Sequence, residues 1–509
     1  MVKQGVLLSN ERLKLYKKPS TWILMGVIVS LTLLGLILSR FFVSLQDRYS
    51  PKWQDQYNSS IEEYKTMLNE NPDDINLAQS VESIKHLLEN KIPPQDWRTD
   101  VVIEYYSFKA AQLIGEKTGK YTDPRTNFDY ENEFFGNTNL TKEQIADRLA
   151  KLQGLLDSKD WHEYVRLKID DLKSGWTKSR SDQEKQVNIE MYELYLSNKI
   201  EPVADLGNNP YYWGGFSDSS IFWKSEQIES IRQNKLNLLR GEDLMGNILT
   251  NSRVKTIEKD IEVSLKRLST NIAPITYDSF MGQFENTATS ISLLSVLLIV
   301  YAANIFASEY TSGTVKLLLI TPHKRKRIFW AKTILMVELS VIALAANFIL
   351  AFLISGSFTA FRGIDSMQVM HLFGNVVQLP YLLYILLKYL VMMLPVLTYG
   401  ALAMMMSVIT RKSAISIAVT MVLMFGSDII ISIITMFSGS FVIPGIKFLL
   451  FANTSLEVYL PSALVSMTGL TGQTVDPTMT LGFSVAVLLV YMVCFLWIAR
   501  DSFCRRDVK

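Results

Sequence analysis

The chain has 509 residues, of which 49% are hydrophobic and 20% are charged, and its formal net charge is +2. Residues 43–283 hold 39 of the 49 acidic and 30 of the 51 basic residues, so this block carries −9 and the remainder +11. This division excludes a uniform soluble domain and predicts a basic, apolar membrane protein interrupted by a polar, acidic domain. With its only cysteines at Cys494 and Cys504, the chain can form no disulfide within that block.

The N-terminal segment, residues 1–21, contains "VLLSNERLKLYKKPSTW", which combines apolar residues with basic residues that would form a second face of a helix. The pattern predicts an amphipathic helix lying flat at the membrane surface, although a plain basic tail would give the same charge. Residues 22–42, "WILMGVIVSLTLLGLILSRFF", are long and apolar enough to cross a bilayer. No small-x-small cleavage site follows, so we expect an uncleaved first span.

Residues 43–283 are predicted to form a mainly helical domain, because apolar residues recur at helical spacing between charged faces. One such helix follows "NLT", where Asn139 or Thr141 could provide the N-cap.

Residues 284–500 contain five further apolar stretches, which gives six predicted spans in all. The five stretches begin near Ser290, Phe329, Tyr381, Ala414 and Leu481. Residues 440–470 are apolar but broken, and are predicted to form an outer re-entrant segment before the last span, while 501–509 form a cytoplasmic tail. The expected fold is therefore an all-α polytopic membrane protein with six transmembrane helices and a large helical domain between spans 1 and 2.

The orientation of these spans follows from lysine and arginine in the short loops. The basic segments precede span 1, separate spans 2 and 3, separate spans 4 and 5, and follow span 6. All of them lie on one face if the number of spans is even. We therefore expect a multi-pass protein of the bacterial plasma membrane, with both termini in the cytoplasm and residues 43–283 outside it.

Three ionisable residues lie within predicted spans, where charge is costly and points to function. Lys388 lies about 10 Å into its span, and Asp428 lies at a similar depth in the next one, so we expect these two side chains to pair. Lys388 could alternatively extend outward to the membrane surface. Glu338 lies in span 3 without an evident partner.

Signals of enzymatic chemistry are missing from the sequence. The four histidines are scattered without metal-ligand spacing, and neither a nucleophile elbow nor a complete phosphate-binding loop is present. We expect no catalytic residues, no metal site and no cofactor bound by this chain.

The stretch Ser308–Lys332, "SEYTSGTVKLLLITPHKRKRIFWAK", holds six basic residues and one acid between spans 2 and 3. A positive-inside loop accounts for the charge alone. The order of the residues resembles that found in the permease subunits of type-2 ABC exporters. The chain is similar to those bacterial permeases that carry a large extracytoplasmic insert between spans 1 and 2. The matching positions are Glu309, Gly313, Thr314, Leu318, Leu319, Pro322, Arg325 and Lys332.

The resemblance implies that residues 308–328 form a cytoplasmic coupling loop that docks on a separate ATPase, and that residues 1–21 form the connecting, or elbow, helix. An ion pair of Glu309 with Arg325 or Lys332 would hold this loop. The family's partners would be ATP-binding-cassette subunits, which carry ATP and Mg, a second identical or paralogous permease, and membrane lipid; no nucleic acid is expected. Its function would be ATP-driven export of an amphiphilic peptide, antibiotic or lipid. The alternative is a membrane-anchored sensor or cell-envelope scaffold that acts through the external domain.

Overall fold

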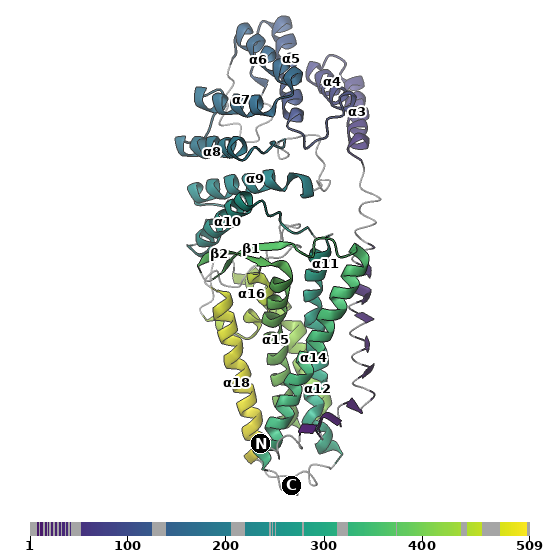
Figure 1. Ribbon diagram of the computed structural model, residues 1–509. Coiled ribbons are helices and arrows are strands. Elements are labelled where there is room, and N and C mark those ends of the chain that lie inside the picture. Colours follow the sequence, from purple (N-terminus) through teal and green to yellow (C-terminus); the bar gives the residue numbers. More distant parts are fainter. Residues whose placement is uncertain are drawn as a thin grey trace. The chain divides into compact units, whose positions relative to one another are not determined.

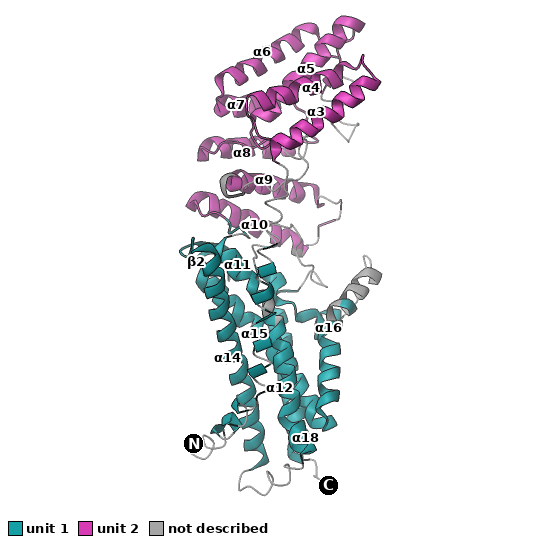
Figure 2. Cartoon of the chain, turned by 90° about the vertical axis from the view of Figure 1, so that its right-hand side faces the viewer, with its two compact units in different colours: residues 1–44, 274–372, 377–509 teal, residues 45–273, 373–376 magenta. Residues whose placement is uncertain are grey.

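The computed structural model describes most of the chain from residue 52 onward, together with isolated positions between Leu8 and Phe41. Outside the described part lie residues 125–138, 205–218, 244–245, 247, 250, 277–278, 313–323, 373, 439–444, 461–478 and 506–509. At 219–221, 252, 289–290, 292, 427–428 and 430–438 only the backbone is described. The chain divides into two compact units: residues 1–44, 274–372 and 377–509 form unit 1, and residues 45–273 and 373–376 form unit 2 (Figure 2).

Unit 2 is built from helices that pack in sequence order. They are α3 (Trp53–Glu70), α4 (Ile75–Glu89), α5 (Arg98–Thr118), α6 (Lys142–Ser158), α7 (Trp161–Ser174), α8 (Asp182–Asn198), α9 (Ser219–Arg240) and α10 (Asn251–Thr270). Each of these helices contacts the next one along the chain, which gives the stack visible in Figure 2. Their shared core includes the fully buried Trp97, whose ring lies 5.0 Å from that of Tyr164.

Short polar side chains begin several helices of unit 2. Thr141 caps α6 in a capping box: its hydroxyl accepts from the Gln144 amide at 3.2 Å, and the Gln144 side chain accepts from the Thr141 amide at 2.8 Å. Of the two predicted caps, Thr141 is therefore the one used. Asp74 and Ser181 are the N-caps of α4 and α8, and their side chains accept hydrogen bonds from backbone amides of the first turn.

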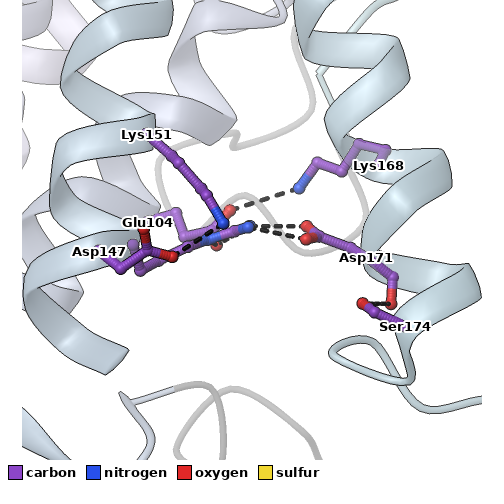
Figure 3. Close-up of polar contacts among 7 residues, drawn as sticks. Glu104, Asp147, Lys151, Lys168, Asp171 and Ser174 are labelled. Atoms are coloured by element: carbon purple, nitrogen blue, oxygen red, sulfur yellow. Dashed lines mark hydrogen bonds and ion pairs between the residues drawn. The ribbon is translucent and has the colours of Figure 1, made fainter. Parts of the chain in front are cut away.

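A charged network lies inside unit 2, between α5, α6 and α7 (Figure 3). The Arg148 guanidinium donates to both carboxylate oxygens of Asp171 at 2.8 Å and, through Nε, to Glu104 Oε1 at 2.8 Å. Lys168 approaches the other oxygen of Glu104 at 3.4 Å. Burial acts to lower the pKa of Arg148, but the Glu104 and Asp171 carboxylates outweigh it and raise that pKa. The network joins three helices through one buried cation.

We expect Arg148→Met to destabilise α5, α6 and α7 by about 3–5 kcal/mol, because it removes the buried cation that Glu104 and Asp171 share. Lys151→Met on the same helix is the matched control, since Lys151 pairs with Asp147 at 2.8 Å on the exposed surface and such pairs contribute about 0–1 kcal/mol. Hydrogen exchange of the full-length protein measures the effect. Equal loss of protection in the two variants would contradict it.

Unit 1 is a helical bundle. Its main helices are α11 (Phe280–Asn286), α12 (Ile291–Thr311), α14 (Arg325–Thr359), α15 (Tyr381–Thr410), α16 (Ser413–Ser438) and α18 (Leu481–Arg505), with the 3₁₀ turn η2 (Thr287–Ser290) between α11 and α12. Helix α15 lies at the centre, against α12, α16 and α18, and α12 also packs on α14 (Figure 1). Gly400 permits the close approach of α15 to α12, since a Cβ there would meet Leu298 Cδ2 at 2.7 Å.

Four of these helices are long and apolar enough to cross a membrane: Leu293–Thr311, Arg325–Thr359, Tyr381–Thr410 and Leu481–Arg505. Helix α16 contains a shorter apolar segment, Ser413–Gly426. Of the predicted first span, the described positions between residues 22 and 41 are all helical. Helix α11, which the predicted domain boundary at 283 would divide, lies wholly in unit 1.

Two features of the chain depart from a purely helical fold. The predicted loop between spans 3 and 4 contains a two-stranded hairpin, β1 (Met367–Leu372) and β2 (Asn375–Pro380), with Gly374 at φ 90° in the turn. The expectation of an all-α chain is therefore wrong at this loop. The described part of the predicted re-entrant segment consists of three 3₁₀ turns, η3 (Ile446–Phe448), η4 (Phe451–Asn453) and η5 (Leu456–Tyr459), and η4 and η5 pack against α18.

Candidate functional site

Lys332 lies in the second turn of α14 with only 2% of its side chain exposed. Its ammonium group donates to Glu309 Oε1 at 2.7 Å, to Glu11 Oε2 at 3.0 Å and to the carbonyl of Ile305 at 3.2 Å. These three acceptors match the three N–H donors of a lysine. The cation is therefore fully satisfied inside the protein, between two carboxylates.

Three parts of the chain meet at Lys332. Glu309 lies two residues before the end of α12, and Glu11 belongs to the described helical positions 11–13 near the N-terminus. Aromatic rings close the site: Phe306 stacks on Phe329 with centroids 5.8 Å apart, and Phe503 of α18 lies 4.9 Å from Phe306. Because this surrounding is apolar, loss of one partner of the cluster leaves charge that water cannot reach easily.

The ion pair joins Glu309, at the start of the predicted coupling loop 308–328, to Lys332, four residues beyond its end. Of the two partners expected for Glu309, Lys332 is the one that contacts it. The Arg325 guanidinium donates to the carbonyl of Cys504 at 3.4 Å. The other predicted positions of the loop, Gly313, Thr314, Leu318, Leu319 and Pro322, lie outside the described residues.

Glu338, predicted without an evident partner, pairs with Arg12 at 2.8 Å. Together with the contact between Glu11 and Lys332, this pair attaches neighbouring residues of the N-terminal segment to two turns of α14. The Arg12 side chain is 47% exposed and that of Glu338 22%. This second pair is therefore more exposed to solvent than the first and contributes less to stability. Sequence reasoning missed Glu11 and Arg12 as partners, because their spacing from α14 carries no local signal.

A second buried ion pair lies at the other end of the bundle. Lys388 Nζ lies 2.5 Å from Glu285 Oε1, and the Tyr381 hydroxyl donates to Glu285 Oε2 at 2.6 Å. The Lys388 side chain is buried, so the alternative of an outward-extending lysine is wrong. The pair joins the short helix α11 to α15, and Glu285 is a partner that the sequence did not suggest.

Lys388 contacts Glu285, whereas the expected pairing with Asp428 falls on a side chain outside the described residues. Asp428 lies in α16. Among the described residues no group of three or more histidine, cysteine, aspartate or glutamate side chains is arranged to hold a metal ion.

The two buried lysines, Lys332 and Lys388, are the candidate functional groups of unit 1 because each forms a buried ion pair.

A family model described as a protein of unknown function, DUF2705, matches residues 269–509. An uncharacterized membrane protein YdbK of Bacillus subtilis (strain 168) is 28% identical over 239 residues, which are 46% of this chain and 85% of the relative. An uncharacterized protein YhcI of the same organism is 26% identical over 245 residues, 48% of this chain and 73% of the relative. The apolar helices and the relative's description as a membrane protein identify this chain as a membrane protein.

Proposed function

We propose that this chain is the permease subunit of an ATP-driven exporter, with six transmembrane helices and residues 43–283 as its extracytoplasmic insert. The observation that carries the proposal is the ion pair between Glu309 and Lys332 at 2.7 Å. These two residues flank the segment that resembles the coupling loop of type-2 ABC exporters. A docking element has to transmit force to the spans, and a buried ion pair at its base provides a rigid connection.

The N-terminal contacts support the same function. Glu11 and Arg12 each pair with a residue of α14, so a movement imposed on residues 1–21 would reach the same helix as a movement of the coupling loop. In this proposal ATPase subunits, which hold ATP and Mg, dock on residues 308–328 and on the N-terminal helix. Two permeases, identical or paralogous, surround the path of an amphiphilic peptide, antibiotic or lipid, and both termini are cytoplasmic.

The test is a purification of the tagged full-length protein from its native membrane in mild detergent, followed by mass spectrometry and an ATP hydrolysis assay. We expect a Walker-motif ATPase to co-purify and to hydrolyse ATP. Leu318→Asp in the proposed docking segment is expected to lower ATPase recovery about tenfold or more, because it places a charge in an apolar contact.

Ile364→Asp is the matched control, because Ile364 is exposed in the loop beyond the opposite end of α14. It is expected to leave ATPase recovery unchanged. Recovery without any ATPase from a folded wild-type protein would overturn the permease proposal and favour a sensor or scaffold that acts through unit 2.

A further inference from the structure

The outward face of α14 carries a continuous stripe that changes from cationic to apolar along the helix. Lys326 and Arg327 are exposed in its first turn. Below them, at spacings of three or four residues, follow Trp330, Ile334, Val337 and Val341, which are 43%, 43%, 38% and 48% exposed. Such spacing places all of these side chains on one side of the helix.

The two cations of the stripe differ from the neighbouring Arg325, which donates to the carbonyl of Cys504. Within the described part of the chain, the side chains of Lys326 and Arg327 form no ion pair or hydrogen bond. Glu338, the acidic residue of the following turns, is already paired with Arg12. Two exposed cations therefore lie one helical turn before the exposed Trp330.

We propose that this stripe binds an anionic phospholipid, with the headgroup phosphate on Lys326 and Arg327 and an acyl chain along Ile334, Val337 and Val341. Trp330 would lie at the level of the glycerol backbone, where amphipathic indole rings concentrate. Lys326 lies about 6 Å nearer the N-terminal end of α14 than Trp330, which is the direction and scale needed to reach the phosphate layer. Lysine and arginine both bind phosphate, arginine through two parallel N–H donors.

Helix α14 is long enough for this placement. Its 35 residues span about 52 Å, whereas the hydrocarbon core of a bilayer is about 30 Å thick. A first turn outside the hydrocarbon core is therefore expected, with about 20 apolar residues still available beyond Trp330. The inference depends on α14 crossing a membrane and does not depend on ATPase docking.

A membrane lipid fits this stripe better than a soluble anion or a protein surface. A free phosphate would use the two cations and leave four exposed apolar side chains without a role. A protein partner in the aqueous phase could reach the cations but not Val337 or Val341, which lie about 10 to 17 Å deeper along α14 than Trp330. Only a molecule with an anionic head and an apolar tail covers the whole stripe.

The test is native mass spectrometry of the detergent-purified full-length protein with equal concentrations of dioleoylphosphatidylglycerol and dioleoylphosphatidylcholine. The wild type is expected to retain phosphatidylglycerol in preference to phosphatidylcholine. Lys326→Gln/Arg327→Gln is expected to lower phosphatidylglycerol retention roughly tenfold, and raised salt should weaken the wild-type preference. Trp330→Ala should lower the retention of both lipids.

Lys412→Gln/Arg505→Gln is the control, because both residues are exposed cations and Arg505 already pairs with Asp501 at 2.8 Å. The control should keep the wild-type preference. Equal retention of phosphatidylglycerol by the two double variants would overturn the proposal. A change in oligomeric state of Lys326→Gln/Arg327→Gln without a change in bound lipid would also overturn it, by assigning the stripe to a contact between copies of this chain.

Discussion

Lys332→Met is expected to release the N-terminal segment and to destabilise unit 1 by about 3–5 kcal/mol, because it removes the buried cation that Glu11 and Glu309 share. Hydrogen exchange at residues 8–13 and the melting temperature in detergent measure the two effects. If the protein is the proposed permease, ATPase recovery should fall with them, because the base of the coupling loop would lose its connection to α14.

A triple variant that removes all three charges of the cluster separates the effect of charge from the effect of packing. In Glu11→Gln/Glu309→Gln/Lys332→Met no buried charge is left alone, so this triple variant should be more stable than Lys332→Met. Lys324→Met is the control, since Lys324 is the exposed N-cap of α14 and its side chain makes no capping bond. A Lys332→Met protein as stable as this control would show that the cluster does not hold the three segments together.

Lys388→Met is expected to have an effect of similar size at the other end of the bundle. It removes the cation beside the buried Glu285 carboxylate, and a broken buried ion pair costs about 3–5 kcal/mol. Tyr381→Phe, which removes one hydrogen bond to the same carboxylate, should cost about 1 kcal/mol. Melting temperatures of purified variants in one detergent give the comparison.

Double-mutant cycles identify the partner of Lys388. The effects of Lys388→Met and Glu285→Gln should be strongly non-additive, because Lys388 Nζ lies 2.5 Å from Glu285 Oε1. The effects of Lys388→Met and Asp428→Asn should add. Additivity in the first cycle and coupling in the second would instead support the pairing with Asp428 that the sequence predicted.

The features that the sequence predicted are those that depend on neighbouring residues. The apolar stretches from Tyr381 and Leu481 begin the helices α15 and α18, because length and hydropathy are local properties of the chain. The cap at Thr141 was also accessible, since a capping box involves only four successive residues. An ion pair of Glu309 with Arg325 or Lys332 was expected because Glu309 is the one acid among six basic residues of Ser308–Lys332, and the structure shows the contact with Lys332.

The partners that the sequence did not reveal are distant along the chain. Lys388 and Glu285 are 103 residues apart, and Arg12 and Glu338 are 326 apart, so only the packing of helices against one another determines these pairs. The hairpin in the loop between α14 and α15 had a local signal, with two short stretches rich in valine and other apolar residues on either side of Gly374. It was missed because that stretch was treated only as the connection between two spans.

The order of helix packing in unit 2 has a consequence for how the protein is made. Because each helix from α3 to α10 contacts its successor in the sequence, most of the contacts form between segments that leave the ribosome close together in time. Both ends of the unit continue into unit 1, at residues 44 and 274. We therefore expect unit 2 to acquire its structure progressively during synthesis, while the later membrane helices are still being translated.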